Sequence, residues 1–334
     1  MKRVGRLYQR IWLYDNLLLA AYKAGKGKRS RLDVINFYRY FDINIEKIGQ
    51  GLRHHRPDIG HYRFFRIRDP KPRHICAAPF PERVLHHAIM NVCQPVLESF
   101  AIFDSYACRK GKGTSKALAR AKQFVRKYPW YLKLDIRKYF DSIDHEILLA
   151  ALARRFKDHE LLRLFAKLVD TYHTEPGKGL PIGNLFSQHG ANFYLGLFDH
   201  WLKEERRVKG YLRYMDDMVL FGPRKSHLTK ELAAVQHFLA RRLKLELKPN
   251  IQLNRSRHGL PFLGYRIFPH TIRLSSSSKR RFINKFIEYE HKWHEGIWSD
   301  EQLVRHMEPL IAFTMVADAK GLRTEVIERY GVPY

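Results

Sequence analysis

Apolar residues recur along this chain with two spacings, one typical of helices and one typical of strands. Helical spacing covers residues 7–23, 81–100, 145–156, 159–171, 187–205 and 225–243. Within the second of these segments, Pro95 is expected to end or kink the helix. Asp144, directly before the third segment, is expected to be its N-cap. Strand-like apolar runs lie at 130–136, 209–222, near the LELK segment at 245–248 and at 261–268, and residues 62–75 alternate as a hairpin does. This order predicts an α+β domain with helices on one face of an antiparallel sheet, followed beyond Pro269 by a basic helical tail.

Charge indicates the kind of partner. The 61 lysines and arginines against 33 acidic residues leave a formal net charge of +28, which favours a polyanion such as nucleic acid. We find neither an apolar run of membrane-spanning length nor a signal-peptide pattern, so no membrane role and a cytoplasmic location are expected. Cys76, Cys93 and Cys108 are far apart and form no CxxC pair, which argues against a disulfide framework or a zinc site.

Three aspartates are the strongest candidates for chemistry. Asp135 stands in an apolar strand, where burial of a lone carboxylate costs several kcal/mol unless a cation compensates it. Asp216 and Asp217 are adjacent at the turn between two apolar strands, where their repulsion also favours a bound cation. Taken alone, Asp135 also fits a strand-terminal acid paired with Arg137 or Lys138, and adjacent acids are common in loops. Together, in a strongly basic chain, the two features indicate phosphoryl transfer with two Mg²⁺ ions. The tip of the 62–75 hairpin presents Arg68, Lys71 and Arg73, which are suited to grip a triphosphate.

Several motifs resemble those of reverse transcriptases. YLKLDIRKYFDSID at 131–144 resembles their first catalytic motif, and RYMDDMVLF at 213–221 resembles their YxDD motif. Between and around these, GLPIGNLFSQ is similar to the loop behind the templating base, FLGY to the primer-grip hairpin, and SYACRKGKGT to an upstream fingers motif. The resemblance implies a right-hand polymerase fold, with an N-terminal helix and fingers at 1–130, a palm at 131–267 and a small helical thumb at 268–334. Part of the fingers is then interleaved with the palm at about 145–190.

The resemblance also implies roles for individual residues. Asp135 and Asp216 correspond to direct ligands of two Mg²⁺ ions, with Mn²⁺ as an alternative, and Asp217 corresponds to a further ligand or a close support. Ile136 is implied in the same metal site. Phe140 falls where the family has an aromatic steric gate against the ribose 2′-hydroxyl, although a core role for its ring is the alternative. The residues implied in dNTP binding are Arg68, Lys71, Arg73, Phe140, Ile182, Gly183 and Gln188. The residues implied in primer and template binding are Tyr214, Met215, Phe262, Leu263, Gly264, Tyr265, Arg109 and Lys112.

Two departures narrow the resemblance. Most of the family has PQG and SP where this chain has Pro181-Ile182-Gly183 and Ser187-Gln188. Both departures are similar to the reverse transcriptases of diversity-generating retroelements, which copy an RNA template with errors at adenines. Because Ile182 lacks the amide hydrogen bonds of a glutamine, low fidelity is expected. Lys248 lies slightly before the position of the family's general-acid lysine, which leaves its role open.

Two other functions compete with this hypothesis. One is another bacterial reverse transcriptase, acting in phage defence or with a retron RNA, although the NAxxH and VTG patterns of retron enzymes are missing. The other is a non-catalytic RNA-binding scaffold that retains a polymerase-like fold. As partners, the resemblance implies a template RNA, a primer or cDNA strand, dNTPs and a small basic accessory protein that forms an oligomer.

Overall fold

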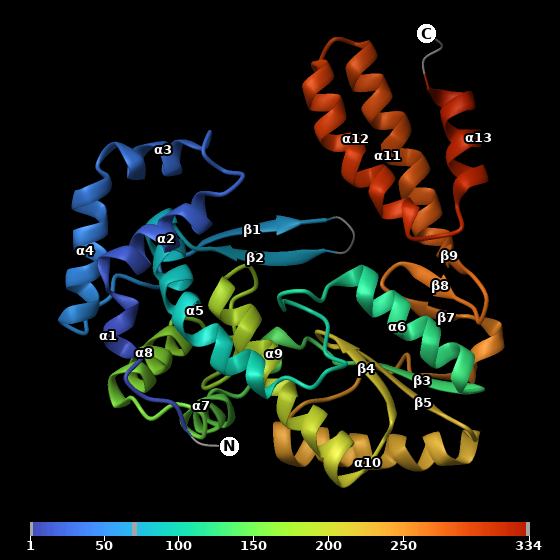
Figure 1. Cartoon of the computed structure of the whole chain (residues 1–334), viewed down its shortest axis with the longest axis horizontal. Helices are drawn as coiled ribbons and strands as arrows, with labels where there is room; N and C mark the ends of the chain where they lie inside the picture. The colour runs from blue at the N-terminus through green and yellow to red at the C-terminus, as the bar shows by residue number, and fades with distance from the viewer. Residues whose placement is uncertain (1–2, 69–71, 332–334) are drawn as a thin grey trace. The chain divides into compact units, whose positions relative to one another are not determined.

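The computed structural model describes residues 3–68 and 72–331, which form two compact units built from alternating stretches of the chain (Figure 1). The first unit comprises Met1–Arg109, Ile136–Arg207 and Ala234–Lys248. The second comprises Lys110–Asp135, Val208–Ala233 and Pro249–Tyr334. Each unit therefore depends on residues that are distant in the sequence.

The first unit is mainly helical. Its helices are α1 (Tyr8–Ile11), α2 (Tyr14–Gly25), α3 (Leu32–Arg39), α4 (Phe41–Arg53), α5 (Phe80–Phe100), α7 (His145–Ala153), α8 (His159–Asp170) and α9 (Leu185–His200), with the second half of α10 (Lys225–Leu243). The unit also contains one hairpin, formed by β1 (Arg63–Ile67) and β2 (Arg73–Ala77). Two short helical segments complete it, η1 (Phe140–Ser142) and η2 (Trp201–Glu205). The long helix α5 packs against α2 and α9, so its two faces lie in the core of this unit.

The expected N-terminal helix over 7–23 is wrong in one respect, because it is broken into α1 and α2. Leu13, between them, has extended backbone angles of φ −57° and ψ 137°. The amide of Asn16 donates to the carbonyls of Ile11 at 2.8 Å and of Ala88 in α5 at 3.0 Å. This side chain satisfies a carbonyl at the end of α1 and ties the break to α5.

Pro95 does not end α5, which continues to Phe100. A proline inside a helix removes one backbone donor and costs about 3 kcal/mol. On either side of it, Cys93 and Leu97 are buried, and burial of these apolar side chains offsets the local cost.

The second unit contains a four-stranded antiparallel sheet. Its strand order is β4 (Gly210–Tyr214), β5 (Asp217–Gly222), β3 (Trp130–Asp135) and β6 (Gln252–Arg255). Helix α6 (Thr114–Lys127) packs on β4 through an apolar face that includes Leu118, Ala121 and Phe124. The predicted α+β class, with antiparallel sheets, is confirmed.

The expected strand at LELK is wrong. Residues 245–248 make only one isolated bridge, from Leu247 to Ile136, and the strand that completes the sheet is β6, five residues later. Lys244 ends α10 with a left-handed φ of 51°. The chain therefore changes direction after α10 and pairs with Ile136 only at Leu247.

A smaller antiparallel sheet and three helices complete the second unit. The strands are β7 (Leu260–Phe262), β8 (Tyr265–Ile267) and β9 (Ile272–Leu274), and the helices are α11 (Ser276–His294), α12 (Asp300–Met315) and α13 (Lys320–Tyr330). Figure 1 shows the three helices as one bundle. Phe282, Phe286, Met307 and Val326 form its buried core. Among the described residues, no helix is both long enough and apolar enough to cross a bilayer.

One carboxylate anchors the N-terminal segment. Asp158 accepts hydrogen bonds from the backbone amides of Arg6, Leu7 and Tyr8 at 2.6, 2.5 and 3.2 Å. Beside these contacts, Val4 pairs with the backbone on either side of Phe156. The segment before α1 is thus held by the residues that precede α8.

We predict that Asp158→Ala lowers the free energy of unfolding by about 2 kcal/mol, because three backbone donors lose their acceptor. Urea denaturation followed by circular dichroism measures the change. Asp170→Ala is the control, since that side chain is 81% exposed. Equal stability of the two variants would contradict the anchoring role.

A second carboxylate links α7 to the end of α10. Asp144 accepts from the backbone amide of Ile147 at 3.0 Å and caps α7, as its sequence predicted, and Lys244 Nζ lies 2.6 Å from its Oδ2. Burial by itself raises the pKa of Asp144, but the hydrogen bonds from Lys244 and from two backbone amides outweigh burial and lower it.

The contribution of Asp144 to stability is therefore predicted to depend on pH. Because its pKa is lower in the folded protein, the stabilisation is fully present above the unfolded pKa of about 3.9 and is lost as the pH falls through the folded value. Asp144→Asn retains a capping oxygen and removes the charge. The difference in unfolding free energy between parent and variant should be constant from pH 5 to 7 and shrink below pH 4; an unchanged difference at pH 3 would contradict the assignment.

Candidate functional site

The strand register brings two of the predicted aspartates together. Asp135, the last residue of β3, is the direct partner of Asp217, the first residue of β5. Directly opposed residues of an antiparallel pair have Cβ atoms about 4.5–5.5 Å apart and point to the same face. Asp217 is also opposite Tyr214 of β4, and Asp216 immediately precedes it in the turn. Three carboxylates are therefore concentrated at one end of the central sheet.

The turn that carries Asp216 has an unusual support. Met215, at the turn, has a left-handed φ of 55°, a conformation that few residues other than glycine adopt. Arg213 on β4 has no exposed surface, and its Nη1 donates to the carbonyl of Met215 at 3.0 Å. The buried guanidinium of Arg213 thus contacts the turn and stabilises the left-handed conformation of Met215.

Burial and charge act together on Asp217. Its side chain is 20% exposed, and one of its oxygens, Oδ1, is buried without a hydrogen-bond partner. The other oxygen lies 3.3 Å from Lys133 Nζ. Burial raises the pKa of Asp217 to about 6; Lys133 opposes this shift, and the neighbouring Asp135 and Asp216 add to it. Lys133 therefore compensates the negative charge of the Asp217 carboxylate only in part.

These residues fit a divalent cation. Among residues 3–68 and 72–331, no group of three or more His, Cys, Asp or Glu side chains is arranged to hold a metal ion. Mg²⁺, however, usually takes only one or two carboxylates and completes its shell with water and substrate phosphates. The opposed Asp135 and Asp217, with an unpartnered buried oxygen on Asp217, match that requirement.

The residues expected to contact the incoming nucleotide belong to the first unit. The backbone carbonyl of Phe140 accepts from Leu180 at 2.8 Å, and the carbonyl of Ile182 accepts from Cys76 of β2 at 2.8 Å. Gly183 has a φ of 120°, and a Cβ there would come within 3.1 Å of the carbonyl of Cys76. The hairpin, the Phe140 turn and the 180–183 loop are thereby joined, and only glycine fits at 183.

The side chains in this group differ in their surroundings. Phe140 is half-buried, with its ring edge-on to Tyr139 at a centroid distance of 5.7 Å. Gln188, in the first turn of α9, accepts from the Cys108 thiol at 3.7 Å. Arg68 and Arg73 are exposed near the tip of the β1–β2 hairpin, and Lys71 lies outside the described residues.

The residues expected to contact primer and template are divided between the units. Tyr214 is half-buried, and its hydroxyl accepts from Thr114 at 3.3 Å. Arg109, in the first unit, uses its guanidinium to bind the carbonyls of Ile102 and Ser105, so it organises its own loop. Lys112 lies in the second unit, in the glycine-rich segment before α6.

The β7–β8 turn corresponds to the FLGY segment. Leu263 and Gly264 at the turn have φ values of 51° and 88°, as a tight hairpin with two left-handed residues requires. Phe262 and Tyr265 on its two strands are each 1% exposed, and the Tyr265 hydroxyl donates to the carbonyl of Phe313 at 2.6 Å. The surface of this hairpin is thus formed by the turn itself, while its aromatic rings belong to the core.

Lys133 and Arg213 contact the candidate site but were not predicted from the sequence as site residues. Lys133 lies two residues before Asp135, so a strand assignment already places both on one face. Arg213 is a cation within an otherwise apolar strand, which is a signal for a buried partner. Lys248, whose role was left open, directly follows the bridge between Leu247 and Ile136.

Comparison with known proteins agrees with this arrangement. Residues 68–267 match the family described as reverse transcriptase (RNA-dependent DNA polymerase). The protein YkfC of Escherichia coli is 27% identical over 143 residues, which cover 40% of this chain and 37% of that protein. The group II intron-encoded protein LtrA of Lactococcus lactis is 23% identical over 172 residues, which cover 49% of this chain and 29% of that protein. The chain thus spans less than two fifths of the length of these relatives.

Among solved structures, apo telomerase from Candida tropicalis matches 80% of this chain and 59% of that chain with a TM-score of 0.50 and 11% identity. At this identity the likeness concerns the fold, and it agrees with the right-hand polymerase fold that the motifs implied. Since the matched family segment covers more than half of the residues, the chain belongs to the reverse transcriptase family.

Proposed function

We propose that this chain is an RNA-directed DNA polymerase, in which Asp135, Asp216 and Asp217 hold the catalytic divalent cations. The observation that carries the proposal is the direct opposition of Asp135 and Asp217 at the end of the sheet, with a buried oxygen of Asp217 left without a partner. Such a cluster of acids is costly in a folded protein unless a cation neutralises it. The family to which the chain belongs supports the same chemistry.

The reaction is nucleotidyl transfer. The primer 3′-hydroxyl loses its proton to water, its oxygen forms a bond to the α-phosphorus of a dNTP, and the bond from that phosphorus to the leaving pyrophosphate breaks. Asp135, Asp216 and Asp217 would hold the Mg²⁺ ions, which would supply Lewis acidity and offset negative charge on the phosphate oxygens. Lys133 keeps the Asp217 carboxylate oriented, and Arg213 keeps the turn that carries Asp216 rigid. Arg68, Lys71 and Arg73 bind the triphosphate, and Phe140 excludes the ribose 2′-hydroxyl.

We further propose that the template is the RNA of a diversity-generating retroelement and that copying is error-prone at adenines. Ile182 and Gln188, where most of the family has glutamine and proline, support this assignment. Another bacterial reverse transcriptase, acting in phage defence or with a retron RNA, is the alternative. A small basic accessory protein that forms an oligomer is proposed as the partner of the complex.

Primer extension tests the catalytic proposal. We predict that Asp216→Asn lowers the rate of dNTP incorporation on an RNA template about 100-fold or more, because a lost metal ligand removes several kcal/mol of transition-state stabilisation. Asp170→Asn, an exposed acid in the first unit, is the matched control and should retain the parent rate. Equal rates in the parent and in Asp216→Asn would exclude the mechanism and favour a non-catalytic scaffold.

Error spectra test the finer proposal. Ile182→Gln should reduce misincorporation opposite template adenine, because the amide adds polar contacts to the nascent base pair. The backbone bond from Cys76 to Ile182 does not depend on the side chain, so the loop is retained. Ile182→Leu is the control and should keep the parent error spectrum. Identical adenine error rates in the Gln and Leu variants, measured by sequencing cDNA made in vitro, would refute the role of residue 182.

A further inference from the structure

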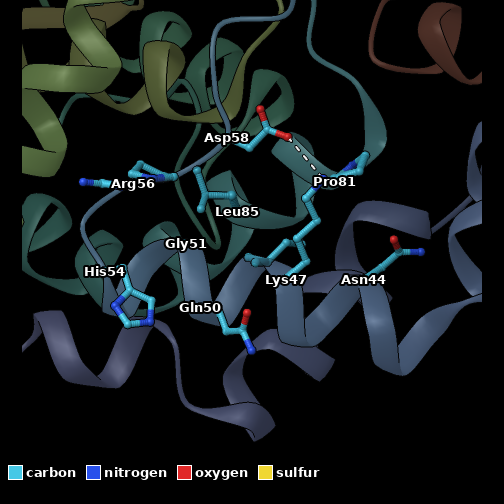
Figure 2. Close-up of a pocket in the computed structure, with 11 residues that line it drawn as sticks. Asn44, Lys47, Gln50, Gly51, His54, Arg56, Asp58, Pro81 and Leu85 are labelled. Atoms are coloured by element: carbon cyan, nitrogen blue, oxygen red, sulfur yellow. Dashed lines mark ion pairs between the residues drawn. The ribbon is translucent and has the colours of Figure 1, made fainter.

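A cavity of about 420 Å³ opens in the first unit, between α4, the segment that follows α4 and the start of α5 (Figure 2). Its volume lies within the range of about 300–1,000 Å³ that is typical of small-molecule sites. None of the residues that the reverse transcriptase motifs single out lines it. It is therefore a second candidate site, separate from the catalytic aspartates.

One part of the wall is apolar. Ile48 on α4, Pro57 on the following segment, and Pro81 and Leu85 on α5 line it. Leu85 is buried and forms the bottom of the cavity. The proline rings are rigid and present apolar surfaces to it. A planar ring fits such a wall better than a flexible polar group does.

The segment after α4 is held close to the helix. The backbone amide of Arg56 donates to the carbonyl of Gly51 at 2.7 Å. A Cβ at Gly51 would lie 3.1 Å from the carbonyl of Arg56, so a glycine is needed for this approach. The contact fixes Arg56 and Pro57 at the edge of the cavity.

The rim of the cavity carries charge. Lys47 and Arg56 contribute two cations and Asp58 one anion, with the side chains of Gln50 and His54 beside them. Lys47 Nζ is 3.9 Å from Asp58 Oδ2, and Figure 2 shows Lys47 reaching from α4 towards that carboxylate. Both side chains are well exposed, so this ion pair is weak. Asp58 also has a closer partner in His61, at 2.7 Å.

An apolar wall beside a cationic rim is complementary to a molecule that combines a flat ring with a phosphate. We propose that this cavity binds an unpaired nucleotide, with the base against Ile48, Pro57 and Pro81 and the phosphate on Lys47. The phosphate replaces Asp58 as the partner of Lys47 and accepts a charge-assisted hydrogen bond from its ammonium group. The nucleotide comes from one of two sources, free nucleoside monophosphate or a base turned out of an RNA strand.

This inference goes beyond the polymerase proposal and does not need it. Binding at the cavity is measured without divalent cations and without any incorporation of nucleotides. A failed primer extension would leave it intact, and a failed binding test would leave the polymerase proposal intact.

Isothermal titration calorimetry in EDTA tests the site with AMP, adenosine, inorganic phosphate and the RNA octamer r(A)8 as probes. The parent protein should bind AMP more tightly than either adenosine or inorganic phosphate, because the nucleotide uses both the wall and the rim. If AMP and inorganic phosphate bind equally well, the apolar wall has no role and the proposal is overturned.

Three variants distinguish binding in the cavity from the nonspecific attraction of a nucleotide to a basic protein. Lys47→Ala should weaken AMP binding about tenfold through the loss of a charge-assisted contact. Asp58→Asn should tighten it about threefold, since the carboxylate no longer competes for Lys47. Lys157→Ala is the matched control: it removes an exposed lysine of the same unit, outside the cavity, and should change nothing. All three side chains are exposed, so the substitutions leave the core intact.

The octamer distinguishes the two sources. The RNA strand is the source if Lys47→Ala weakens the binding of r(A)8 and if an octamer that lacks the base at every second position binds more weakly than r(A)8. The free nucleotide is the source if AMP binds in a Lys47-dependent manner and the octamer does not. Equal losses in Lys47→Ala and Lys157→Ala for every probe would overturn the proposal.

Discussion

The opposition of two carboxylates across neighbouring antiparallel strands is the constraint on which the candidate active site depends. Like charges directly opposite in a sheet are destabilising, and Asp135 and Asp217 hold that relation at the end of the largely buried strands β3 and β5. Lys133 offsets part of the repulsion, yet one oxygen of Asp217 stays buried without a partner. Strongly shifted pKa values cluster at functional sites, and a bound cation is the role that we propose for this arrangement.

The architecture follows from patterns that are strong along the sequence. The strand at 130–136 and the hairpin around 210–222 are apolar runs with clear boundaries, and their pairing alone brings Asp135 to Asp217. Helices α8 and α10 were predicted almost to the residue, because their apolar faces have a regular period. Asp144 was likewise identified as an N-cap from its position before an apolar helical run.

Other features depend on contacts that no local pattern contains. The break before α2 is stabilised by Asn16 through a carbonyl of α5, more than seventy residues away. LELK has the composition of a strand, but it follows the left-handed Lys244 and makes a single bridge, and β6 pairs with β3 in the sheet. The cavity beside α4 needs three segments, including Pro81 of α5, and its charged rim is recognised only once these segments are brought together. Lys133 and Arg213 were detectable as charges within strands, but their partners were not.

The most direct test of the central claim is to locate a metal ion. A crystal of the protein grown with Mn²⁺, an RNA–DNA primer-template and a non-hydrolysable dNTP would give an anomalous scattering peak for each bound ion. The account predicts a peak within about 2–2.6 Å of carboxylate oxygens from both Asp135 and Asp217, the range over which hard cations bind oxygen. Full occupancy of the nucleotide with every Mn²⁺ peak remote from both carboxylates would contradict it.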